Sequence, residues 1–285
     1  MATIVGCVCT SHVPAIGGAL ARGLEQDAYW QPFFAGFPPV REWLGRVKPD
    51  VAVVFYNDHG LNFFLDNLPT FAVGAATEYR NEDEGWGIPA LGSYPGSPAL
   101  SWHIIESLVA ADFDPASCQR MLVDHAFSIP MRLLWPDRAT MPAATVPIAI
   151  NTVQHPLPSP RRCYRLGQTV GRAIASYPED LKVLVVGTGG LSHQLDGARA
   201  GHINREFDLM CMDKLVHDPA ALIHYTVDDL VDVAGSQGVE LMMWMAARAA
   251  LGPRARCIHS NYHVPISNTA AGLLALEATG SVELA

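Results

Sequence analysis

The chain has 285 residues, of which 49% are hydrophobic and only 16% are charged, and its formal net charge is −9. This composition excludes disordered and fibrous proteins, and the negative charge argues against nucleic-acid binding. The sequence contains no apolar run of the roughly 18 residues that a membrane-spanning helix needs. Its six cysteines form no C-x-x-C pair, which predicts reduced thiols and a cytoplasmic location. A charged fraction below the usual ~25% predicts that another subunit covers part of the surface.

Short β-branched runs alternate with segments of helical periodicity along the chain. Runs that are apolar on both faces are typical of central strands covered by helices on each side. In chain order we expect strand 3–9, helix 39–47, strand 51–56, helix 98–111, strand 145–150, helix 161–177, strand 182–187, and helices 203–217 and 238–251. The alternation predicts a single α/β domain over residues 1–285, with a central mixed or mostly parallel sheet covered by helices on both faces.

Three polar clusters directly follow predicted strands. His12 follows the first strand, Asn57, Asp58 and His59 follow the second, and His193 lies just beyond the run that ends at residue 187. The carboxyl ends of such strands share one rim of the sheet, where α/β proteins bind their ligands. A single histidine after a strand is more often a loop residue. Three of them after three apolar strands favour a functional site in which the imidazoles converge.

Glu240 is the only charged residue in the apolar run 239–247. A buried carboxylate is costly without a partner or a metal, but an acid in a first helical turn is also favoured by the helix dipole. Both interpretations stay open on these residues. Two imidazoles and one carboxylate are the ligand set of non-haem Fe(II) oxygenases, and zinc hydrolases use a similar set. A zinc-dependent hydrolase and a non-catalytic protein with structural histidines are therefore the alternatives.

Seven sequence blocks resemble the class III extradiol ring-cleaving dioxygenases, in order from residue 2 to about residue 274. They are TSHVPA (10–15), YNDH (56–59), DEGWG (83–87), VDH (123–125), GTGGLSHQ (187–194), GVELMMW (238–244) and YHVPISNTA (262–270). Within that family they are most similar to the catalytic β subunits of protocatechuate 4,5-dioxygenases. The resemblance implies an enzyme that opens the ring of a catecholic aromatic acid beside its diol with O₂. Cleavage of protocatechuate at the 4,5 bond gives 4-carboxy-2-hydroxymuconate semialdehyde.

The same resemblance assigns roles to five side chains. It implies that His12, His59 and Glu240 bind Fe(II), as the composition of the ligand set also allows. It further implies that His193 is the catalytic base. His125 matches a second catalytic histidine, which stabilises the bound substrate or its oxygenated intermediate.

Other residues of the matching blocks are candidates for supporting roles. Ser267 and Asn268 match residues that contact the substrate carboxylate. Asn57 and Asp58 precede a ligand and are candidates for orienting its imidazole, although a plain turn is at least as good an interpretation of Asp58. Trp86 is interpreted as a core or interface residue rather than a site residue.

Substrate and partner are the least determined parts of this prediction. Gallate, 3-O-methylgallate or an aminophenol would use the same fold and metal site as protocatechuate. In two-subunit members of the family a small α subunit caps the active site. The resemblance therefore implies a separate α subunit in an α2β2 or similar hetero-oligomer, in agreement with the low charged fraction of the chain.

Overall fold

The computed structural model describes residues 1–90, 92–266 and 268–280. Within these ranges the strands form an eight-stranded sheet of order β10-β11-β1-β9-β2-β8-β3-β6 and a three-stranded sheet of order β5-β4-β7. The strands are β1 (Thr3–Thr10), β2 (Val51–Tyr56), β3 (Phe71–Gly74), β4 (Glu78–Asn81), β5 (Ser93–Pro95), β6 (Ala116–Cys118), β7 (Leu122–Val123), β8 (Ala144–Ile150), β9 (Lys182–Thr188), β10 (Ala255–Ile266) and β11 (Thr269–Ala278).

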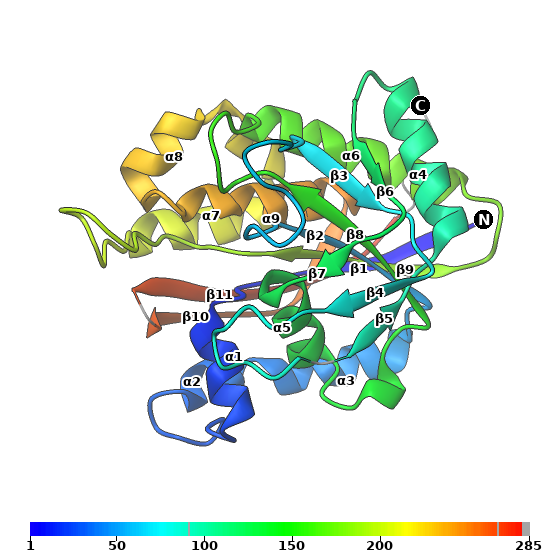
Figure 1. Ribbon diagram of the computed structural model, residues 1–285. Helices are drawn as coiled ribbons and strands as arrows, with labels where there is room; N and C mark the ends of the chain where they lie inside the picture. Colours follow the sequence, from blue (N-terminus) through cyan, green and yellow to red (C-terminus); the bar gives the residue numbers. More distant parts are fainter. Residues whose placement is uncertain (91, 267, 281–285) are drawn as a thin grey trace.

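Helices cover both faces of the large sheet (Figure 1). The helices are α1 (Pro14–Ala21), α2 (Gln31–Phe34), α3 (Phe37–Val47), α4 (Pro98–Ala110), α5 (His125–Leu134), α6 (Pro160–Ser176), α7 (Arg205–His217), α8 (Val227–Ala234) and α9 (Leu241–Ala250), with 3₁₀ turns η1 (Arg138–Thr140), η2 (Pro219–His224) and η3 (Gly238–Glu240). Helices α4, α6 and α9 lie on one face, and α1, α3 and α5 lie on the other. None of the described helices is long and apolar enough to cross a membrane.

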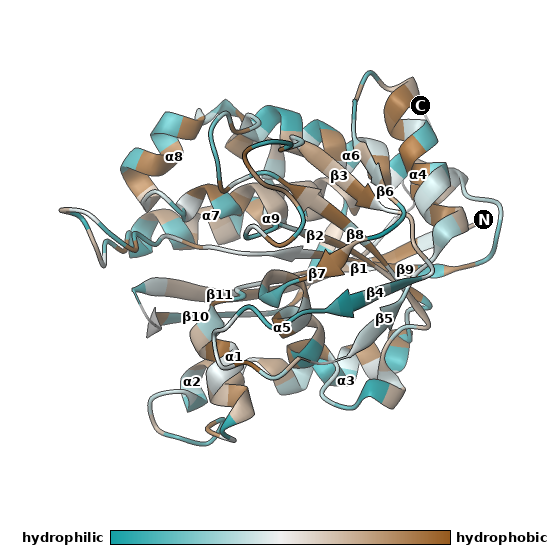
Figure 2. Cartoon of the chain, in the orientation of Figure 1, coloured by the Kyte–Doolittle hydropathy of each residue, from teal (hydrophilic) through white to brown (hydrophobic). Residues whose placement is uncertain are grey.

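The alternating side chains of the central strands produce the two cores. Side chains along a strand point to opposite faces, so β2 divides its residues between the two helical layers. Val51, Val53 and Phe55 join the core under α4, α6 and α9. The other half of the strand joins the core under α1, α3 and α5. Because both faces are buried, the strand is apolar throughout, whereas β4 in the small sheet is hydrophilic (Figure 2).

The predicted fold class is confirmed. Strands β1, β9, β2 and β8 are parallel to one another, while β11 is antiparallel to β1 and β3 is antiparallel to β8. The sheet is therefore mixed. The sequence analysis missed the long β10–β11 hairpin, because β11 reads TAAGLLALEA, a composition of good helix formers. Its position between β10 and β1 overrides that local preference.

The strand register places the carboxyl ends of β1, β2 and β9 at the same height in the sheet. Thr10 of β1 is paired with Thr188 of β9, and Phe55 of β2 is paired with Gly187. Strands β1, β2 and β9 consequently end within one residue of each other. The polar residues that follow these strands meet at this carboxyl rim.

Candidate active site

Four of the predicted site residues come together at the carboxyl rim. Glu240, at the end of η3 and only 6% exposed, lies between three imidazoles. Its Oε1 is 3.6 Å from His12 Nε2 and 3.8 Å from His59 Nε2. Its Oε2 is 3.7 Å from His193 Nε2. The carboxylate that stood alone in the sequence is thus surrounded by the three histidines that follow the strands.

Backbone and amide groups hold this carboxylate in place. Gly190 N–H donates to Glu240 Oε2 at 2.7 Å, and Asn57 Nδ2 donates to Oε1 at 3.1 Å. The turn after β9 passes so close that a Cβ on Gly189 would lie 2.8 Å from Glu240 Cβ. Gly189 also has a φ of 110°, which only glycine adopts cheaply. The glycines of this turn therefore allow the approach of the carboxylate.

Hydrogen bonds at Nδ1 orient the imidazoles of His12 and His59. His12 Nδ1 is 3.1 Å from the buried Thr188 hydroxyl, and His59 Nδ1 is 3.0 Å from Asp124 Oδ2. When a metal ion displaces any proton from Nε2 and the remaining proton stays on Nδ1, both rings present the lone pair of Nε2 toward Glu240. This arrangement, with a partner on the far nitrogen, is how proteins fix metal-binding histidines.

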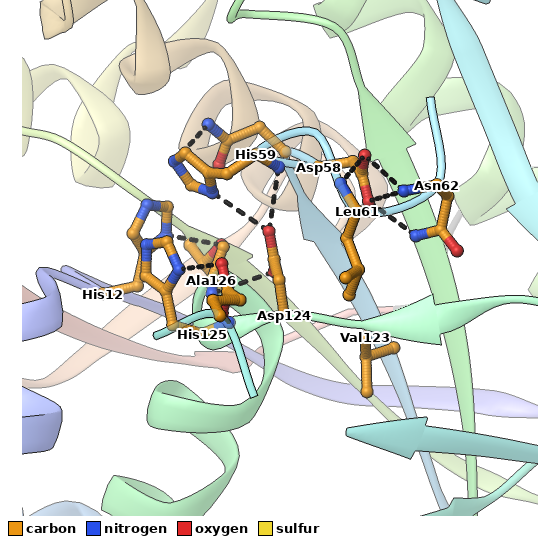
Figure 3. Close-up of polar contacts among 12 residues, drawn as sticks. His12, Asp58, His59, Leu61, Asn62, Val123, Asp124, His125 and Ala126 are labelled. Atoms are coloured by element: carbon orange, nitrogen blue, oxygen red, sulfur yellow. Dashed lines mark hydrogen bonds and ion pairs between the residues drawn. The ribbon is translucent and has the colours of Figure 1, made fainter. Parts of the chain in front are cut away.

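Asp124 joins His59 to the start of α5 (Figure 3). Its Oδ2 also accepts the backbone N–H of His59 at 2.9 Å, and its Oδ1 accepts the N–H of Ala126 at 3.0 Å. Asp124 is therefore the N-cap of α5 as well as the partner of the imidazole,. It is fully buried.

His193 and His125 flank the same space. His193 Nδ1 lies 2.9 Å from the carbonyl oxygen of Leu191, to which it donates, so its Nε2 faces Glu240. His125 is the first residue of α5, and its ring centroid is 4.3 Å from that of His59 and 5.5 Å from that of His12. The five predicted metal and catalytic residues thus surround one space.

Charge is concentrated at the centre of the site. Burial raises the pKa of Glu240, but the surrounding imidazoles of His12, His59 and His193 outweigh it and hold the pKa well below its usual range. Burial lowers the pKa of His12 against the opposing effect of Glu240. At His59 desolvation is outweighed by Asp124 and Glu240, which raise the pKa to about 10. Burial of Asp124 is likewise outweighed by the bond from His59, which lowers its pKa to about 2.

The contacts of Glu240 with His12 and with His59 are each short enough for the two side chains to bind a common metal ion. Two ligands that each lie about 2.0–2.2 Å from one ion can be no more than about 4.4 Å apart. The distances from Glu240 Oε1 to the two Nε2 atoms satisfy this limit. Asn57 Nδ2 lies 3.2 Å from His59 Nε2 as well as 3.1 Å from Glu240 Oε1, so both ligand atoms already face one electropositive group. Ring nitrogens of His12, His59 and His125 also lie within 4.8 Å of one another.

A pocket of about 340 Å³ opens beside these residues. Its volume is in the range of small-molecule sites, about 300–1,000 Å³. Trp86, Val153 and Leu195 contribute to its walls and are 61%, 50% and 54% exposed. Trp86, interpreted from the sequence as a core or interface residue, is therefore not a core residue; it is exposed and lines the pocket, and an interface role stays a prediction.

The remaining predicted residues lie around this centre. The Asp58 carboxylate accepts the backbone N–H groups of Leu61, Asn62 and Phe63, which is the geometry of a turn. Asn268 lies in the turn between β10 and β11 with a φ of 61°, next to Thr269, which lines the pocket. Ser267 lies outside the described residues. The roles assigned to these residues stay predictions.

Three partners of the histidines were missed in the sequence. Thr188, Asp124 and Glu84 each contact a site imidazole at Nδ1. Asp124 precedes a helical run and so carries an N-cap signal, but its bond to His59 spans 65 positions. A contact of that length has no local signature.

The chain matches known proteins over most of its length. Residues 6–273 match the family model described as the catalytic LigB subunit of aromatic ring-opening dioxygenase. A gallate dioxygenase of Pseudomonas putida is 41% identical over 192 residues, which cover 67% of this chain and 56% of that protein. A 2,3-dihydroxyphenylpropionate/2,3-dihydroxicinnamic acid 1,2-dioxygenase of Photorhabdus laumondii is 32% identical over 72% of this chain and 61% of its own length. An enzyme of the same name from Rhodococcus sp is 29% identical over 87% and 89%.

The chain spans little more than half the length of the gallate dioxygenase and about three fifths of the Photorhabdus enzyme. A solved structure, the uncharacterized protein JW3007 of Escherichia coli K12, covers 95% of this chain with a TM-score of 0.56 and 12% identity. At that identity the likeness shows the fold alone.

Proposed function

We propose, from the premise that this chain belongs to the catalytic LigB subunit family of aromatic ring-opening dioxygenases, that it is a non-haem Fe(II)-dependent extradiol dioxygenase. Residues 1–285 would form its single catalytic domain. The observation that carries the proposal is the position of Glu240 Oε1, 3.6 and 3.8 Å from the Nε2 atoms of His12 and His59. The sequence resemblance implies a metal-dependent enzyme, and a set of two histidines and one carboxylate is typical of oxygenases that use Fe(II).

We assign the third ligand to Glu240 rather than to His125. Both are close to His12 and His59, but only Glu240 brings a negative charge that offsets part of the charge of a dication. Glu240 is also buried and held by Gly190 and Asn57 with one oxygen near both imidazoles. His125 is then free to act on the substrate.

The chain's own residues support proton transfer and orientation. Bound Fe(II) would supply open coordination positions for the two oxygens of a catechol and for O₂. His193 donates through Nδ1 to a carbonyl, so Nε2 carries a lone pair that can accept a proton from a catechol hydroxyl. His125 would act from the neighbouring wall, where Nε2 can accept a hydrogen bond from a substrate hydroxyl and, once it has taken up that proton, can donate to an anionic oxygen.

For the substrate, we place gallate ahead of protocatechuate. Protocatechuate was the first choice from the sequence and gallate its alternative, and the relative that is 41% identical is named gallate dioxygenase. The two acids differ by one ring hydroxyl, and both have a carboxylate that Ser267 and Asn268 would contact. 3-O-methylgallate and aminophenols remain to be compared in the same assay.

A partner subunit is part of the proposal. The family description names a catalytic subunit, and the pocket has exposed apolar side chains at Trp86, Val153 and Leu195. Apolar surface around a pocket is typical of a docking site. A small α subunit that covers it in a cytoplasmic hetero-oligomer would exclude water from the ring-opening reaction.

A panel of catechols in an oxygen electrode tests the activity. The full chain is assayed with ferrous ion under reductant, with and without a co-expressed α subunit, on gallate, protocatechuate, 3-O-methylgallate, 2-aminophenol and unsubstituted catechol. We expect O₂ consumption that a chelator abolishes and ferrous ion restores, with gallate the best substrate. Stoichiometric zinc in the purified protein together with no O₂ uptake on any ring would overturn the proposal in favour of a zinc hydrolase.

Two matched variants test the ligand assignment. Glu240→Gln and His125→Gln each replace one neighbour of the same two imidazoles. Elemental analysis should find iron lost from Glu240→Gln and retained by His125→Gln, because only the first removes a charged ligand. The opposite result would assign a three-histidine site to His12, His59 and His125.

A further inference from the structure

A loop carboxylate that the proposed chemistry does not use binds His125 at two points. Glu84 lies in the loop between β4 and β5. Its Oε2 accepts the backbone N–H of His125 at 2.6 Å, and its Oε1 lies 2.8 Å from His125 Nδ1. The two side chains are 13% and 3% exposed. The carboxylate therefore binds the ring and the backbone of one residue at once.

The first contact is explained by the position of His125 in its helix. His125 opens α5, and the first N–H groups of a helix have no partner within it. A carboxylate at this end is favoured both by the hydrogen bond and by the helix dipole. The same group then fixes the imidazole, because an ionised carboxylate only accepts hydrogen bonds. Nδ1 of His125 must therefore carry the proton.

Fixing the proton on Nδ1 determines which edge of the ring is active. Nε2 lies on the opposite edge of the imidazole, and the ring lines the pocket beside His12 and His59. The neighbouring Asp124 does not share this task, because its oxygens bind His59 and the N–H of Ala126. His59 thus binds the carboxylate of Asp124, and His125 binds the carboxylate of Glu84.

We propose that Glu84 is a positioning residue of the ring-opening reaction, which holds His125 as the Nδ1–H tautomer with Nε2 directed at the substrate. This inference rests on the proposed function, since it assumes that His125 acts on the substrate. The same loop carries Trp86, whose ring centroid is 6.4 Å from that of His125 and which lines the pocket. Release of Glu84 would therefore loosen both the imidazole and the wall beside it.

Steady-state kinetics of Glu84→Gln in the full iron-loaded chain measure the effect. An amide of the same shape has one acceptor where the carboxylate has two, so it can bind both the backbone N–H and Nδ1 only if the ring changes to the Nε2–H tautomer. Misplacement of a reacting group by about 1 Å costs about 10²-fold, and we expect kcat to fall by about that factor with KM and iron content little changed. Glu82→Gln is the matched control, because Glu82 pairs with Arg80 at the surface and should keep wild-type kinetics.

A double-mutant cycle separates positioning from a structural role. If Glu84 acts through His125, Glu84→Gln should lower kcat no further in a His125→Gln chain. Equal losses in both backgrounds would overturn the inference, and so would a kcat per bound iron that stays at the wild-type value. If Glu84→Gln does not fold, Glu84→Asp replaces it in the cycle. Its shorter side chain cannot reach both contacts.

Nitrogen NMR of the histidine rings gives a readout that does not need activity. In the metal-free full chain we expect the signals of His125, assigned by their loss in His125→Gln, to be those of the Nδ1–H tautomer. Glu84→Gln should shift them toward Nε2–H. If the wild-type chain opens no ring but shows these signals, the proposed function fails and the Glu84 contact stands. If the wild-type chain is active but its His125 tautomer is the same in Glu84→Gln, the inference on Glu84 is overturned.

Discussion

Asp124→Asn perturbs the buried carboxylate that orients His59. Asp124 accepts three hydrogen bonds, two of them from His59 through Oδ2 at 2.9 and 3.0 Å. An asparagine can keep the N-cap bond to Ala126 with its oxygen. Its amide NH₂ group then stands where Oδ2 was, against two other donors.

The magnitude follows from those two contacts. Each buried donor left without a partner costs about 1–3 kcal/mol, so the free energy of unfolding of the metal-free chain should fall by about 2–6 kcal/mol. The imidazole can recover one bond by moving its proton to Nε2, but Nε2 is the atom that faces Glu240. Loss of the correct tautomer at a metal-binding histidine should weaken metal affinity about 10–100-fold.

Urea unfolding of the metal-free chain and competition with a chelator for Zn²⁺ or Fe²⁺ measure the two effects. Asp137→Asn is the matched control, because Asp137 is the exposed N-cap of η1 and accepts the N–H of Ala139 at 3.0 Å. It should change the free energy of unfolding by no more than about 0.5 kcal/mol. An Asp124→Asn chain as stable as the control, with wild-type metal affinity, would refute the role of Asp124 in fixing His59.

Three further substitutions test other parts of the site. Gly189→Ala should lower both the free energy of unfolding and the metal affinity, because its Cβ would meet Glu240. Gly197→Ala is the control. Gly197 has a φ of 71° and open space around it, so the substitution should cost only the backbone strain of about 1–2 kcal/mol,. Thr188→Val removes one neutral hydrogen bond to His12 and should weaken chelator-measured metal affinity about 2–10-fold. Asn268→Gly keeps the positive φ of the turn and removes the side-chain amide. Its kcat/KM should fall about 10-fold more for gallate than for unsubstituted catechol. Equal losses on the two substrates would contradict a contact with the substrate carboxylate.

The convergence of the histidines could be predicted because it follows from the sheet. Parallel apolar strands end on one rim, and β1, β2 and β9 proved to end within one residue of each other. The predicted ranges of these strands differ from the observed ones by at most one residue at an end. Two interpretations of Glu240 stayed open, and the structure joins them: the residue lies in a 3₁₀ turn before α9 and is buried among imidazoles.

The partners of the histidines could not be predicted, because they depend on distant loops. The bond between Glu84 and His125 spans 41 positions, and that between Asp124 and His59 spans 65. Which oxygen meets which nitrogen is decided by how the β4–β5 loop and the start of α5 pack against the rim. The motifs that contain these residues were recognised, but their carboxylates were given no role.

The position of β11 distinguishes substitutions that would alter the sheet from substitutions that would not. Strand β11 is hydrogen-bonded between β10 and β1, and β1 leads directly to His12. Asn268 lies between Ile266 and Thr269, which form the last pair at this end of the β10–β11 ladder. We expect relatives to differ in their preferred ring substituent through substitutions in the turn that carries Asn268. Such substitutions should cost little folding stability and should leave the residues at the carboxyl rim unchanged.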